Sequence, residues 1–78
     1  MDAKTIFDNN PTLRAEAGEA VENINAEIIE KFGRGENRTV GEVMEIVTTA
    51  GEAFIGEIEK FRTVENAAKV AREAVGLC

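Results

Sequence analysis

Residues 39–61 of this chain read TVGEVMEIVTTAGEAFIGEIEKF, and the other segments can be understood as packing around them. Thr39 and Glu42 have the spacing of a capping box, in which the two side chains accept hydrogen bonds from free backbone N–H groups. Apolar residues then recur at helical spacing: Val40, Val43, Val47, Phe54, Ile58 and Phe61. This pattern predicts one long amphipathic helix over residues 39–61, about 34 Å in length.

Two further helices are predicted on either side of this segment. Asn10 followed by Pro11 is a helix start signal, and Gly33 suits the left-handed position after a helix, which predicts a helix over residues 11–32. Thr63 can cap a third helix over residues 63–77. The connector 33–38 is short, so we expect the first two long helices to pack antiparallel.

The chain is therefore predicted to be one all-α domain, 1–78, in which three main helices form a small bundle. A short N-terminal helical turn carrying Ile6 and Phe7 is expected to cover one end of the core. A core built from 78 residues gives only marginal stability, which self-association would increase.

Composition excludes several functional classes. The chain has 15 acidic and 9 basic residues, a net charge of -6, which disfavours binding to a nucleic-acid backbone. We find neither a long apolar run nor a signal-peptide pattern, so we expect a cytoplasmic protein that does not enter a membrane. The single cysteine, Cys78, excludes an internal disulfide and leaves a disulfide between two chains as an alternative to simple exposure or packing.

The side chains that most enzymes use are absent. The sequence contains no His, Ser, Tyr or Trp, which removes histidine bases, serine nucleophiles and the common metal-ligand sets. The carboxylates do not have the spacing of a calcium-binding loop. We therefore predict a protein that is not an enzyme, with no catalytic residue, no cofactor and no metal.

The apolar arc of residues 39–61 extends over roughly 180°, from Ile46 to Ile55, which is wider than one neighbouring helix covers. Either the two other helices cover one half each, or part of the arc is a subunit interface. Glu57 lies inside the arc and needs either water or a partner. Apolar residues off the main helix faces, Ile29, Val70 and Leu77, add surface to be covered. The candidate interface residues are Ile46, Ala50, Phe54, Ile55, Glu57 and Ile58.

Three arginines lie next to predicted helix N-termini, where backbone N–H groups favour an anion: Arg34, Arg38 and Arg62. They are candidates for binding a small anion or nucleotide, and solubilising turn residues are the alternative explanation. Glu45, Glu52 and Glu59 repeat every seven residues and form an acidic ridge. The ridge is typical of a solvated face, or of an acidic inhibitor that imitates nucleic acid.

Part of the chain resembles a known family. The segments 51–55 (GEAFI), 58–59 (IE) and 73–75 (EAV), together with Arg62 and Ala67, resemble the helical hairpin of phage proteins that sequester cyclic-nucleotide immune signals. The resemblance covers about half of the chain, which has a shorter turn and lacks that hairpin's aromatic ending. It implies binding of a nucleotide anion.

The function that we predict from the sequence is that of a small acidic interaction or regulatory module. It self-associates, with a dimer favoured, and binds a protein partner. The alternatives are the anion or nucleotide binder and the acidic inhibitor described above.

Overall fold

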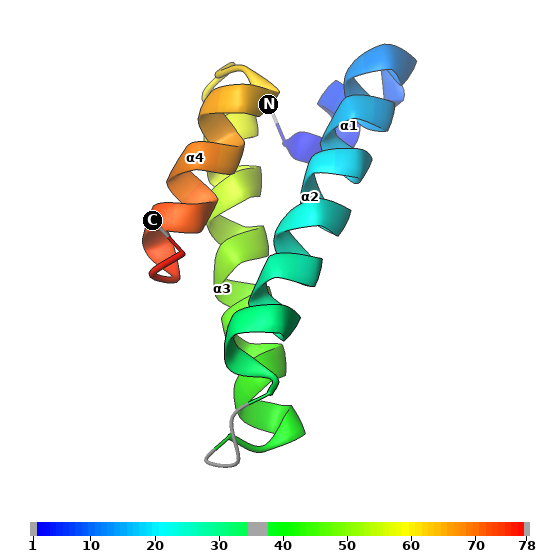
Figure 1. Ribbon diagram of the computed structural model, residues 1–78. Helices are drawn as coiled ribbons and strands as arrows, with labels where there is room; N and C mark the ends of the chain where they lie inside the picture. The colour runs from blue at the N-terminus through cyan, green and yellow to red at the C-terminus, as the bar shows by residue number, and fades with distance from the viewer. Residues whose placement is uncertain (1, 35–37, 78) are drawn as a thin grey trace.

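The computed structural model describes residues 2–34 and 38–77, and within them the chain forms four α-helices (Figure 1). These are α1 (Ala3–Asp8), α2 (Pro11–Phe32), α3 (Val40–Glu59) and α4 (Val64–Ala74). The predicted all-α bundle is confirmed, and no strand occurs in the described part of the chain. The long helices begin within a residue of their predicted starts, whereas α3 and α4 end earlier than predicted. The prediction for Cys78 falls outside the described residues.

The starts of the long helices are set by side-chain caps. Asn10 Oδ1 accepts the N–H of Leu13 at 3.1 Å, and Thr63 Oγ1 accepts the N–H of Asn66 at 3.0 Å. At the start of α3, Thr39 Oγ1 accepts the N–H of Glu42 at 3.2 Å, and its hydroxyl donates to Glu42 Oε1 at 3.3 Å. These caps explain why the predicted helix starts were accurate. The capping box at Thr39 differs from the prediction in one half, because the Glu42 carboxylate accepts from the Thr39 hydroxyl and not from a backbone N–H.

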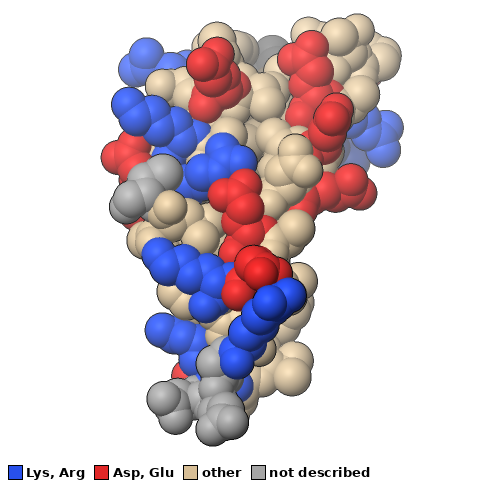
Figure 2. Space-filling model, viewed as in Figure 1, with Lys and Arg blue, Asp and Glu red and all other residues tan. Residues whose placement is uncertain are grey.

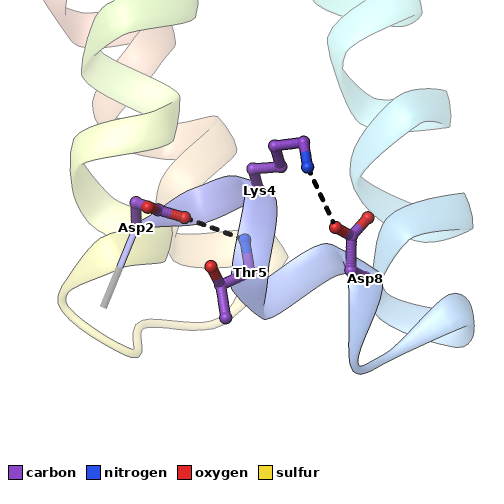
Figure 3. A network of polar contacts seen from close by, with 4 residues as sticks. All are labelled: Asp2, Lys4, Thr5 and Asp8. Atoms are coloured by element: carbon purple, nitrogen blue, oxygen red, sulfur yellow. Dashed lines mark hydrogen bonds and ion pairs between the residues drawn. The ribbon is translucent and has the colours of Figure 1, made fainter.

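Helix α1 is a short lid on the bundle. Asp2 Oδ1 accepts the N–H of Thr5 at 2.9 Å, and this hydrogen bonding lowers the pKa of Asp2 below its ordinary value of 3.8 (Figure 3). The same figure shows the exposed ion pair of Lys4 with Asp8, 3.5 Å long, which contributes little stability. The lid is attached through the Ala3 N–H, which donates to Glu59 Oε2 at 2.8 Å. Ile6 and Phe7 pack half-buried against the core, as the sequence predicted.

The core lies between α2, α3 and α4, with α2 antiparallel to α3 (Figure 1). Phe54 is the largest buried side chain. Each helix contributes a short row of buried residues: Ala17, Ile24 and Ile28 from α2; Ala50, Phe54 and Ile58 from α3; Ala67, Ala68 and Ala71 from α4; and Ala3 from α1. Because the fully buried residues of α4 are all alanines, it packs closely on α3, and these two helices share the most extensive contact in the bundle.

The structure corrects the prediction for Gly33 and shows a continuous helix at Gly51. Gly33 ends α2 in the right-handed region, with φ -79°, and not in the left-handed conformation. A side chain at Gly33 would place its Cβ 2.6 Å from the carbonyl oxygen of Ile29, so glycine is needed here for space. Helix α3 runs unbroken through Gly51, where an added Cβ would meet no atom within 4 Å. Packing within the chain therefore gives no reason for glycine at that position, although it costs about 0.5–1 kcal/mol relative to alanine.

Phe61 is not on the apolar face of α3, contrary to the prediction. Helix α3 ends at Glu59, and Phe61 follows with φ +62° and 73% exposure. The Arg62 N–H bonds the Glu57 carbonyl at 3.1 Å and the Phe61 N–H bonds the Ile58 carbonyl at 2.9 Å, which is the Schellman termination of a helix. Helix α4 ends in the same motif with Gly76 at the equivalent position, φ +75°. The periodicity continued into Phe61, but the helix did not.

Replacing Phe61 with glycine is expected to stabilise the fold by about 1 kcal/mol, because a left-handed φ is strained for a residue with a Cβ. Urea unfolding followed by circular dichroism measures this change. Gly76→Ala is the matched opposite substitution in the sister motif, and it should lower the stability by a similar amount. A Phe61→Gly protein that is less stable than the wild type would show that the phenyl ring contributes packing.

The bundle is 42 Å long and 18 by 17 Å in cross-section. Helix α3 has 20 residues and α4 has 11, so at the standard rise they extend over about 30 and 17 Å. Figure 1 shows α4 beside the C-terminal half of α3, and α1 at the same end of the bundle. The N-terminal half of α3 projects beyond both, beside the end of α2. Among the described helices, none has the length and apolar character to cross a membrane.

Candidate interaction surface

Most of the predicted interface residues belong to the interior of the chain itself. Ala50, Phe54 and Ile58 are each about 1% exposed, and Ile46 and Ile55 are half-buried against the same core. The wide apolar arc is therefore covered, over the C-terminal half of α3, by neighbouring helices of the same chain. Over this half, packing within the chain accounts for the arc, and the three buried residues present no surface to a partner.

Glu57 is a structural link between α3 and the start of α4. Its side chain is only 13% exposed, and Oε2 lies 3.3 Å from the ammonium of Lys60. Its other oxygen, Oε1, accepts a hydrogen bond from the Asn66 side-chain amide at 3.2 Å. The polar residue inside the apolar arc is thus partnered within the chain and occupied at the α3–α4 turn.

The three candidate anion-binding arginines do not form one site. Arg34 pairs with Glu30 at 3.1 Å, and the Arg38 guanidinium lies 5.0 Å from the ring centroid of Phe32. Both lie near the start of α3, whereas Arg62 follows its other end, about 30 Å away along the helix. In addition, Glu42 already places a negative charge in the first turn of α3.

Apolar side chains are exposed where α2 ends and α3 begins. Ile29 at the end of α2 is 57% exposed, and Val40 and Met44 at the start of α3 are 81% and 55% exposed. They border an open groove of about 270 Å³ between the two helices. We call this region the end surface; it is lined by Ile29, Gly33, Arg38, Thr39, Val40, Val43 and Met44.

The end surface is exposed because the bundle is asymmetric. Helices α1 and α4 both pack at the opposite end, so the projecting segment consists of two helices alone (Figure 1). Of the large apolar side chains that are exposed in the described segments, three lie here and the fourth, Phe61, lies at the other end of α3. The sequence placed Ile29 off its helix face correctly, whereas Val70 and Leu77 are half-buried. It predicted that Val40 packs in the core, which is wrong, because the side chain is exposed.

The opposite side of α3 in the projecting segment has both polar and apolar side chains. A second groove of about 370 Å³ lies between α3 and the end of α4, lined by Arg38, Glu42, Glu45, Ile46, Thr49, Ala74 and Val75. The two faces of the projecting segment therefore differ in chemistry. The face towards Met44 is apolar, and the face towards Glu42 and Glu45 carries charge.

Polar contacts tie α4 to α2. Arg72 donates two hydrogen bonds to Glu27, from Nε at 3.0 Å and from Nη2 at 2.7 Å. This bidentate pair lowers the pKa of Glu27 below its ordinary value of 4.5. The Lys31 ammonium donates to the carbonyl of Gly76 at 2.6 Å. None of these contacts involves a residue that lines the end surface.

The described residues contain no group of three or more Cys, Asp or Glu side chains arranged to hold a metal ion. Comparisons of the chain with protein-family models, with curated proteins and with solved structures found no match.

Proposed function

We propose that this protein is a non-enzymatic interaction module that self-associates through the end surface and thereby presents its remaining faces to a protein partner. The observation that supports this proposal is the exposure of Ile29, Val40 and Met44 on two adjacent helices. The groove between them provides a concave apolar surface.

The energetics favour an occupant for this surface. Fully burying a Val, Ile or Met side chain stabilises by about 1.5–3 kcal/mol, and the three residues are contiguous. A pair of helices with an apolar face is stable when that face packs against another layer, which α4 and α1 supply at one end of the bundle only. A second copy would supply the missing layer at the other end.

The residue types support binding rather than catalysis. The chain has no His, Ser or Tyr to act as a base or a nucleophile. The polar groups with perturbed pKa values, Asp2 and Glu27, have structural hydrogen-bond partners and lie outside the end surface.

Substituting Met44 with lysine is expected to weaken self-association at least about tenfold, because a charge would be placed in an apolar contact. Sedimentation velocity across a concentration series measures the effect. Asn23→Lys adds the same charge on another side of α2 and should leave association unchanged. Circular dichroism of both variants should match the wild type. Equal association of the Met44→Lys protein and the wild type would overturn the proposal.

The geometry supports the two alternatives less well. A nucleotide site that uses Arg34, Arg38 and Arg62 together is not formed, because Arg62 lies at the other end of α3. The acidic ridge is also smaller than the sequence indicated, because Glu59 accepts a hydrogen bond from the lid. Glu45 and Glu52 remain as exposed carboxylates.

A further inference from the structure

Charge is distributed unevenly along the hairpin. Residues 15–30 contain five glutamates and no basic residue, whereas residues 31–38 contain three basic residues and one acidic. Figure 2 shows the same trend on one face, with acidic side chains over the upper part of α2 and basic side chains at the lower end, beside the connection to α3. The end surface is therefore bordered by basic residues near the hairpin connection and by glutamates further along the helices.

The side of α3 that bears the end surface is uncharged over several turns. Val40, Met44, Thr48 and Gly51 share this side at helical spacing. Arg38 precedes the stripe by two residues, and Glu52 lies at its margin at the other end. Both side chains are exposed, and neither forms an ion pair with another residue in the described part of the chain.

We propose that a second copy of the chain docks on the end surface in an antiparallel arrangement about a two-fold axis, with Arg38 of each copy facing Glu52 of the other. This inference rests on the proposed self-association and specifies its geometry. The midpoint between Arg38 and Glu52 along the chain is residue 45, so the axis passes close to Met44. The apolar side chains then meet in the centre of the interface, and each charge pair lies at its rim.

Charge complementarity selects the antiparallel arrangement. In a parallel dimer, Arg38 would face Arg38 and the glutamates of α2 would face each other, which is repulsive in a chain with a net charge of -6. The antiparallel arrangement instead opposes the basic end of each hairpin to the acidic stretch of the other. Gly51 then lies opposite the start of the partner's α3, and the absence of a side chain allows close approach there.

The size of the contact sets the expected strength. The stripe from residue 40 to residue 51 is about 17 Å long, and the bundle is 18 Å wide. A face of this size is at the low end of protein interfaces, which corresponds to weak and reversible association. The experiments therefore need concentrations from roughly 10 µM to 1 mM.

A charge-reversal experiment tests the arrangement. Arg38→Glu and Glu52→Arg each place like charges opposite one another in the dimer, so each variant alone should associate at least about tenfold more weakly than the wild type. Mixing the two variants in equal amounts restores both opposite-charge pairs, and the mixture should associate about as strongly as the wild type. Sedimentation velocity measures all of these samples at one ionic strength. Glu73→Arg, a reversal of the same kind at an exposed position of α4, should associate like the wild type.

Each outcome has a distinct meaning. A mixture that stays as weak as its components, or single variants that associate like the wild type, would overturn the antiparallel arrangement while wild-type association still supports the proposed function. A wild type that is monomeric throughout would overturn the proposed function and this inference together. Circular dichroism of the variants shows that loss of association does not arise from unfolding.

Discussion

Replacing Phe54 with alanine is expected to lower the free energy of unfolding by about 3–5 kcal/mol. Phe54 is 1% exposed and is the largest buried side chain, in a core that also contains residues of α2 and α4. Its removal takes away the apolar area and leaves a cavity that helices packed on alanine cannot fill without shifting. A small domain has a total stability of about 5–15 kcal/mol, so the variant would be close to unfolded at room temperature. Urea denaturation followed by circular dichroism measures the loss.

Phe61→Ala is the matched control for this substitution. Phe61 is 73% exposed, so removal of its ring should change the free energy of unfolding by less than about 0.5 kcal/mol. Similar losses for the two variants would mean that Phe54 is not the centre of the core. The fold described above would then be incorrect.

Replacing Ala71 with leucine is expected to cost about 1–3 kcal/mol through overpacking. Ala71 is fully buried in the contact of α4 with the core, where Ala67 and Ala68 are also buried. A leucine side chain at this position must push α4 away from its neighbours, which also strains the hydrogen bonds of Arg72 to Glu27. Thermal unfolding measures the change.

Ala74→Leu, one turn later in the same helix, provides the comparison. Ala74 is exposed, so the same added volume should be accommodated with little change in stability. If leucine at position 71 were as stable as leucine at position 74, α4 would not be packed as closely as the alanine row implies.

The architecture could be predicted from sequence because local signals and the apolar pattern agree. Asn10, Thr39 and Thr63 each cap a helix as expected, and Pro11 begins the first long helix. The ends were harder to predict, because a Schellman motif depends on backbone conformation rather than on periodicity. Gly76 marks such an end recognisably, whereas Phe61, with the same conformation, has the composition of a core residue.

The interaction surface could be predicted only in part. The width of the apolar arc indicated that something must cover it, but the periodicity of one helix does not reveal where its neighbours end. Val40 and Phe54 share the apolar side of α3, yet the first is exposed and the second buried, because α4 is shorter than α3. Ile29 indicated the interaction surface more reliably than the width of the arc did, since it lies off the core face of its own helix and is exposed.

The role of Glu57 also could not be predicted from helical periodicity alone. From the sequence, a carboxylate inside an apolar arc is equally a structural or a binding group. Its contacts with Lys60 and Asn66 assign it to the turn between α3 and α4, and these partners are neighbours in space that spacing alone did not identify.

Sedimentation equilibrium of the wild-type chain tests the central claim most directly, because it measures mass without assuming a shape. One chain has a mass of 8.5 kDa. If the end surface binds a second copy, the weight-average mass will rise from this value towards twice this value as the concentration approaches roughly 1 mM. A mass that stays at 8.5 kDa over the whole range would contradict self-association through the end surface.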